Sequence, residues 1–181
     1  MKNVIVVSVF LLSIVACNKK EYVKNKKMAD NSAITTNAEN GTLEGLVDQY
    51  LAMKNALVNA DGAKTAELGK AILDNSKVLF NNPNNKDVAE ILSDIQENAE
   101  HISENADKME HLRKHFEFLS KDFEDLVAVH PYSKTLYKDF CPMANDNKGA
   151  YWLSEYKEIS NPYQDESMRT CGEVKQEIAG K

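Results

Sequence analysis

The chain has 181 residues and a formal net charge of −6, with 28 acidic side chains against 22 basic ones. Proteins that bind nucleic acid present clustered Lys and Arg to the phosphates, and no basic patch with interleaved aromatic residues occurs in this sequence. We therefore expect no nucleic-acid partner.

The N-terminal stretch, MKNVIVVSVFLLSIVAC, has the pattern of a bacterial lipoprotein signal. Lys2 gives it a charged start, residues 4–15 are apolar, and Cys17 follows a small residue. The apolar run is shorter than the roughly 20 residues that a membrane-spanning helix needs. We predict that residues 1–16 are a signal peptide, that Cys17 is the lipidated mature N-terminus, and that the protein is an outer-membrane or periplasm-facing lipoprotein of the cell envelope.

Residues 17–41 are first Lys-rich and then rich in Asn, Ala and Thr, without a helical or strand period. Such a composition is typical of a flexible tether. Residues 42–181 remain, and their length is usual for one domain with one core. We predict a lipid anchor, a tether and a single domain that carries the function.

Apolar residues recur every three or four positions after residue 42, which indicates amphipathic helices. Asp61 is placed to cap the second helix, NNPNN at 81–85 interrupts the pattern, and His130-Pro131 stops it. Short connections favour antiparallel neighbours, so the predicted fold class is all-α, an up-and-down four-helix bundle. The predicted helices cover residues 43–57, 61–79, about 86–102 and 109–129. On the sequence, the last two are either separated by a turn near Asn105 or joined as one bent helix.

Two histidines, His111 and His115, are four residues apart and therefore share one face of the fourth predicted helix. Two neutral imidazoles at this spacing can chelate one metal ion. Leu112 stands where a zinc peptidase needs a glutamate, so we do not expect peptide hydrolysis. The alternative is that the pair only borders the core. His101 and His130 have no comparable partner and are expected at the surface or at helix ends.

The C-terminal segment changes character. Residues 135–140 and 150–154 alternate well enough for two short strands, with the turn sequence NDNKG at 145–149 between them. Asn-Pro-Tyr at 161–163 is another turn. We predict an irregular C-terminal segment that contains a short β-hairpin.

Cys141-Pro142-Met143 and Met168-Arg169-Thr170-Cys171 bring a thiol and a thioether close together on each of two arms of this segment. Soft sulfur donors together with imidazole favour Cu(I), whereas zinc makes little use of methionine. A disulfide between the two cysteines is the competing interpretation, because exported thiols tend to oxidise and the closed loop is worth about 3.5 kcal/mol. The residues alone do not decide between the metal site and the disulfide. The candidate metal ligands are His111, His115, Cys141, Met143, Met168 and Cys171.

The tail motifs, which are Cys-Pro-Met-Ala at 141–144, Gly-Ala-x-Trp-Leu-Ser at 149–154, Asn-Pro-Tyr at 161–163 and Met-x-x-Cys-Gly at 168–172, resemble a small domain-of-unknown-function family. Its members are stand-alone envelope lipoproteins of Bacteroidetes-type bacteria, and the same domain is appended to periplasmic adaptor subunits of copper and silver efflux systems. The histidine pair followed by phenylalanine matches many stand-alone members, whereas Gln164-Asp165 departs from the aromatic residue and glycine that commonly follow Asn-Pro-Tyr.

The resemblance covers about residues 43–176 and implies a role in heavy-metal handling, with an efflux adaptor as partner. We therefore expect a lipid-anchored envelope protein that binds a soft metal ion, Cu(I) in the first place, as an acceptor or carrier for metal efflux or homeostasis. The alternative is a disulfide-stapled structural or protein-interaction module without a metal. We do not expect an enzyme, because a histidine beside Cys141 would lack the oxyanion-type glycine loop and the acid that orients the base.

Overall fold

A computed structural model of the chain describes residues 41–181. The predicted signal peptide, the lipidation site Cys17 and the tether up to residue 40 lie outside these residues. Within residues 41–181, no helix combines the length and the apolar character that a membrane crossing requires.

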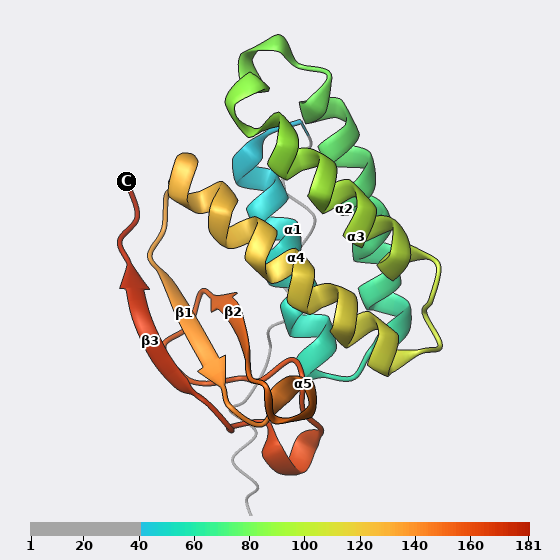
Figure 1. The fold of residues 1–181 in the computed structure, drawn as a ribbon, viewed down its shortest axis with the longest axis vertical. Helices are drawn as coiled ribbons and strands as arrows, with labels where there is room; N and C mark the ends of the chain where they lie inside the picture. The colour runs from blue at the N-terminus through green and yellow to red at the C-terminus, as the bar shows by residue number, and fades with distance from the viewer. Residues whose placement is uncertain (1–40) are drawn as a thin grey trace, which may run out of the picture. The chain divides into compact units, whose positions relative to one another are not determined.

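Four long helices follow one another in the chain (Figure 1): α1 (Leu43–Val58), α2 (Gly62–Phe80), α3 (Ala89–Ser103) and α4 (Met109–Val129). The Asp61 side chain accepts the Lys64 backbone N–H at 2.9 Å, which confirms the predicted cap of α2. The third helix begins later than predicted, because Pro83 opens a short 3-10 helix, η1 (Pro83–Val88), before α3. The four helices are therefore where the apolar pattern places them.

The helices pack mainly against their neighbours in the chain, α1 on α2, α2 on α3 and α3 on α4. Gly69 allows α2 and α3 to approach closely, since a Cβ atom at this position would lie 2.8 Å from Ile102 Cγ2 and 3.1 Å from the Ala99 carbonyl oxygen. This contact fixes the last turn of α3, where His101 lies. Glu104–Lys108 then form a short connection, so α3 and α4 make a helical hairpin.

The predicted up-and-down four-helix bundle is not confirmed as a closed bundle. Tyr50 of α1 stacks on Phe116 and Phe123 of α4, with ring centroids 5.1 and 4.5 Å apart. Strand β2 (Ala150–Ser154) also packs against these two helices, α4 and α1. The chain is mostly helical, and a small sheet takes part in closing its core.

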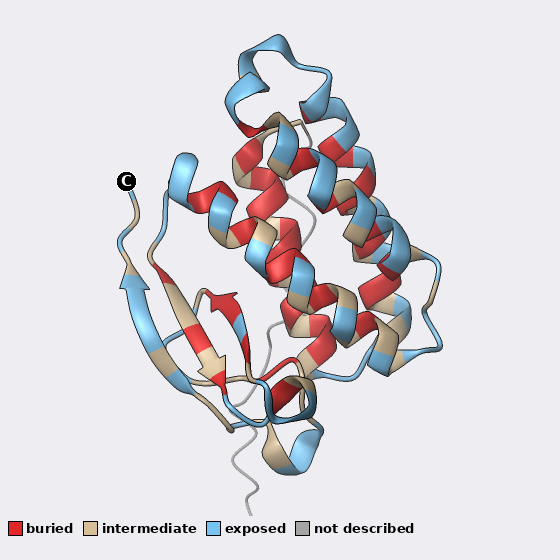
Figure 2. Ribbon diagram, in the orientation of Figure 1, coloured by how far each residue is buried: buried red, intermediate tan, exposed pale blue. Residues whose placement is uncertain are grey.

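The sheet has three antiparallel strands in the order β2-β1-β3, where β1 is Leu136–Cys141 and β3 is Glu173–Ile178. The predicted hairpin is confirmed by the pairing of β1 with β2. Its turn contains a single left-handed turn, α5 (Ala144–Asn147), in which Asn145, Asp146 and Asn147 have positive φ. Strand β3 was not predicted. It is largely exposed (Figure 2), and its sequence therefore lacks the alternation of apolar and polar residues that would indicate a strand.

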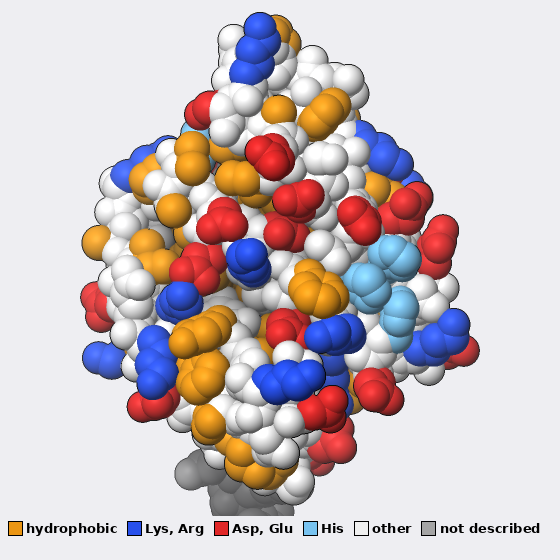
Figure 3. Space-filling model, in the orientation of Figure 1, with side chains coloured by type: hydrophobic (Ala, Val, Ile, Leu, Met, Phe, Trp, Pro, Cys, Tyr) orange, Lys and Arg blue, Asp and Glu red, His pale blue; other side chains and the backbone are white. Residues whose placement is uncertain are grey.

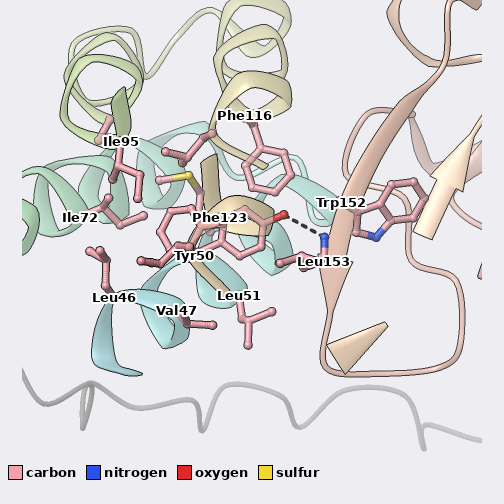
Figure 4. Packing of buried hydrophobic residues seen from close by; sticks show 14 of the residues in the cluster. Leu46, Val47, Tyr50, Leu51, Ile72, Ile95, Phe116, Phe123, Trp152 and Leu153 are labelled. Atoms are coloured by element: carbon pink, nitrogen blue, oxygen red, sulfur yellow. Dashed lines mark hydrogen bonds between the residues drawn. The ribbon is translucent and has the colours of Figure 1, made fainter. Parts of the chain in front are cut away.

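The core joins helices and sheet through a buried hydroxyl group (Figure 4). The Tyr50 hydroxyl accepts the Leu153 backbone N–H at 3.0 Å and lies 2.8 Å from Ser120 Oγ. Trp152, next to Leu153 on β2, is also buried. The hydrogen bond between this hydroxyl and Leu153 holds β2 on the helices, because leaving a polar group unpaired in the core would lower the stability of the fold.

Candidate metal site

Three histidine side chains meet at the α3–α4 hairpin. His101 lies in the last turn of α3, and His111 and His115 lie in the first half of α4. One ring nitrogen of each lies within 4.8 Å of those of the other two. The rings of His111 and His115 have centroids 4.5 Å apart. Histidine side chains gather at one spot of the surface in Figure 3, beside acidic and basic side chains.

The Nε2 atom of His111 is buried and has no hydrogen-bond partner within residues 41–181. Buried ring nitrogens are normally paired, so an orphaned one needs an explanation. A metal ion bound at the cluster would be a partner of the right chemistry, because neutral imidazole binds metals through a ring-nitrogen lone pair.

His115 is kept in the neutral form that metal binding needs. Its Nδ1 lies 3.2 Å from Asn98 Oδ1. Burial, followed by the neighbouring His101, His111 and Lys114, lowers the pKa of His115 to about 4. The ring is therefore uncharged at neutral pH, and no proton has to leave it before an ion binds.

The cluster can hold a transition-metal ion. Imidazole ligands suit zinc, copper, iron and nickel, and three of them leave a coordination position for a further ligand. His101 is exposed, whereas His111 and His115 are half-buried. Sites with an open position exchange ligands more readily than closed four-ligand sites, so this arrangement fits reversible binding better than a structural metal.

A surface pocket of about 680 Å³ adjoins the cluster on the side of α5 and is lined in part by His111, Arg113, Glu117 and Tyr163. Two of its charged groups, Lys114 and Glu117, form an ion pair of 3.2 Å. The pocket leaves space beside His111 through which a second molecule could approach the cluster.

Sequence reasoning found two of the three histidines. The expectation that His101 has no comparable partner is wrong, because its ring stacks on that of His115. His130 stands at the C-cap of α4, where its backbone N–H donates to the Leu126 carbonyl at 2.8 Å, as a helix-end residue should.

The two cysteines also meet each other. Cys141, buried at the end of β1, and Cys171, half-buried before β3, have their Sγ atoms 3.0 Å apart as free thiols. The hydrogen bond shared with Cys141, with a smaller contribution from burial, raises the pKa of the Cys171 thiol. A small shift of the two side chains would bring the sulfurs to bonding distance for a disulfide.

The sulfur donors do not join the imidazoles in one cluster. Neither Cys141 nor Cys171 belongs to the group of ligand atoms formed by the three histidines. Met143 is 48% exposed, and Met168 is half-buried in the loop before Cys171. The six candidate ligands therefore fall into a histidine group, a cysteine pair and two methionines near the pair in sequence.

The loop that carries Met168 and Cys171 is held in two ways. Asn161 is buried, its backbone N–H donates to the Arg169 carbonyl at 2.7 Å, and its Nδ2 donates to the Cys171 carbonyl at 2.6 Å. Arg113 of α4 donates to the Pro162 and Gln164 carbonyl oxygens at 3.2 and 2.9 Å. The Asn-Pro-Tyr turn therefore docks the tail onto the helix that carries two of the three histidines.

Residues 46–134 match a family model described as "Protein of unknown function (DUF3347)". The match runs through the four long helices and includes all three clustered histidines. The tail motifs from Cys141 to Gly172 lie beyond it. The comparison with curated proteins found no match, and neither did that with solved structures. Over its helices, the chain is thus similar to a domain of unknown function.

Proposed function

We propose that this protein is a lipid-anchored component of the cell envelope that binds a copper ion at the cluster of His101, His111 and His115 and passes it on in metal efflux or homeostasis. The observation that carries the proposal is the convergence of three ring nitrogens within 4.8 Å of one another. The Nε2 atom of His111 supports it, because this buried nitrogen has no hydrogen-bond partner among the residues that the structure describes.

The choice of copper rests on ligand chemistry and on the resemblance to domains of copper and silver efflux adaptors. Divalent copper binds nitrogen ligands more tightly than the other divalent first-row ions, zinc included, and imidazole also accepts copper in its reduced state. The two cysteines that favour Cu(I) over zinc in the sequence lie outside the histidine group. Both copper states therefore belong in the test.

A carrier needs a site that a partner can reach. The exposed ring of His101 and the pocket beside His111 meet this need. The lipid anchor predicted at Cys17 would keep such a carrier at the membrane, close to an efflux adaptor. This part of the proposal rests on the signal sequence and the resemblance alone.

The test is a titration of the whole chain in detergent, with Cu(I) under anaerobic conditions and with Cu(II), each against a competing chelator. We expect one tightly bound ion. His111→Gln and His101→Gln should each weaken binding by more than about tenfold, or about 1.4 kcal/mol. His130→Gln is the matched control, because this histidine lies outside the cluster.

The Cys141→Ser/Cys171→Ser double variant decides where the ion sits. Binding that survives in this variant and fails in the histidine variants places the ion on the imidazoles. Binding that fails only in the cysteine variant would move the site to the sulfur pair, and no binding in any form would remove the proposed function.

The second candidate is a disulfide-stapled interaction module, favoured by the separation of 3.0 Å between the two Sγ atoms. Mass spectrometry of the exported protein with and without reduction and alkylation tests it. A quantitative Cys141–Cys171 bond in a protein that binds no copper supports this candidate. Alkylation of both thiols without prior reduction contradicts it.

A further inference from the structure

Asn98 and Asp122 form a chain of hydrogen bonds behind His115. Asn98 Nδ2 donates to Asp122 Oδ2 at 3.0 Å, while Asn98 Oδ1 faces His115 Nδ1 at 3.2 Å. The same Nδ2 also donates to the Asp94 carbonyl at 3.2 Å. Asn98 belongs to α3, whereas Asp122 and His115 belong to α4, so the chain links the two helices that carry the cluster.

The chemistry of the partners sets the direction of these bonds. An ionised carboxylate and a backbone carbonyl can only accept, so the Asn98 amide must turn its NH₂ group toward Asp122 and Asp94. Its carbonyl oxygen then faces His115 and can only accept a hydrogen bond there. A neutral imidazole has a single N–H, so His115 must carry it on Nδ1, and its Nε2 keeps a free lone pair.

We propose that Asn98 and Asp122 are positioning residues, which fix His115 in the tautomer whose Nε2 is free to bind a metal ion. We call the hydrogen bonds from Asp122 through Asn98 to His115 the relay. Its role in metal binding rests on the proposed metal site, whereas the tautomer of His115 is a property of the metal-free protein. Partners behind a metal-binding histidine hold its ring and raise its basicity, and their loss typically costs 10–100-fold in metal affinity.

Asp122→Asn tests the relay without changing its shape. The new amide can donate as well as accept, so the carboxylate no longer fixes the direction of the Asn98 side chain, and only the Asp94 carbonyl still favours it. Burial raises the pKa of Asp122 to about 6, and the comparison is therefore made at pH 8, where this carboxyl is ionised. Asp125→Asn, at an exposed position of the same helix, is the matched control.

Nitrogen NMR of the metal-free whole chain reads the tautomer of His115 directly. We expect Nδ1–H alone in the native chain and in Asp125→Asn, and a mixture of both tautomers in Asp122→Asn. The chelator titration with Cu(I) should then show about tenfold weaker binding in Asp122→Asn and unchanged binding in the control.

The relay is wrong if the native protein carries Nε2–H on His115, or if Asp122→Asn leaves the tautomer unchanged, whether or not copper binds. A shifted tautomer with unchanged copper affinity overturns the claim that the relay serves the metal site. A shifted tautomer in a protein that binds no copper confirms the relay and removes the proposed function instead.

Discussion

The imidazole of His101 stacks on that of His115, with ring centroids 4.3 Å apart and an angle of 14° between the planes. The two residues come from different helices, so this contact joins the last turn of α3 to the first half of α4. An ion bound to both would bridge the helical hairpin. Metal binding and the stability of the hairpin should therefore be coupled.

Copper should raise the thermal stability of the protein. A ligand at 100 times its dissociation constant stabilises the folded state by about 2.7 kcal/mol. For a chain of this size we expect a rise of about 5–10 °C in Tm, measured by calorimetry. The rise should be at least halved in His101→Gln, in line with its weaker binding, and reversed by a chelator. An equal rise in His101→Gln would show that the ion does not bridge the two helices.

The buried ion pair of Lys54 and Glu155 should respond unequally to removal of its two members. Lys54 is fully buried, and its ammonium lies 2.7 Å from Glu155 Oε2, which belongs to a side chain that is 15% exposed. Glu155→Ala leaves a buried charge without its main partner, and we expect a loss of about 3–5 kcal/mol in the free energy of unfolding. Lys54→Met should cost less, because the remaining carboxylate still accepts the Asn55 side-chain N–H at 2.8 Å.

Urea denaturation of the two single variants and of Lys54→Met/Glu155→Ala measures this asymmetry. The double variant should be more stable than Glu155→Ala, since it no longer buries a lone ammonium. A double variant as unstable as Glu155→Ala would locate the loss in packing rather than in charge.

Stability should fall as the pH rises through the titration of Asp139. Both of its carboxylate oxygens are buried without a hydrogen-bond partner in the described part of the chain. Burial raises the pKa of Asp139 to about 7, although Lys54 acts in the opposite direction. The folded state therefore keeps a proton that the unfolded state releases near pH 4, and stability present below pH 4 is lost by about pH 7.

The loss should reach a few kcal/mol, up to about 4, between these limits. Asp139→Asn should remove this part of the pH dependence, because the amide does not titrate, and should be more stable than the native protein at pH 8. Urea denaturation at pH 4, 6 and 8 measures the effect, with the exposed Asp87→Asn as control. Equal pH profiles for the native chain and Asp139→Asn would contradict the prediction.

Arg113 should hold the C-terminal tail on α4. It donates to two carbonyl oxygens of the loop and lies 3.1 Å from Asp165 Oδ1. Arg113→Leu should increase amide hydrogen exchange over residues 160–171 and lower the free energy of unfolding by about 2 kcal/mol. Arg113→Lys should not restore protection, because a single ammonium cannot span the three acceptors. Unchanged exchange in Arg113→Leu would assign the docking to Asn161 and the aromatic contacts instead.

The third histidine shows how far sequence reasoning reaches. The spacing of His111 and His115 fixes their common face, because both lie on one helix. His101 lies three residues before Glu104, and His111 lies three residues after Lys108, the two ends of the α3–α4 connection. Residues placed equally on either side of a short connection face each other in a helical hairpin, so this symmetry was a usable signal for His101.

The sequence by itself determined the helical stretches, the β1–β2 hairpin and the shared face of His111 and His115, because each depends on local periodicity, caps and turn residues. The structure added the turn that separates α3 from α4. Only the tertiary structure decided that His101 completes the cluster, that β3 adds an edge strand, and that the cysteines meet each other rather than the imidazoles. These are contacts between residues distant in the chain. They depend on how the helices and the sheet pack, which local patterns in the sequence do not specify.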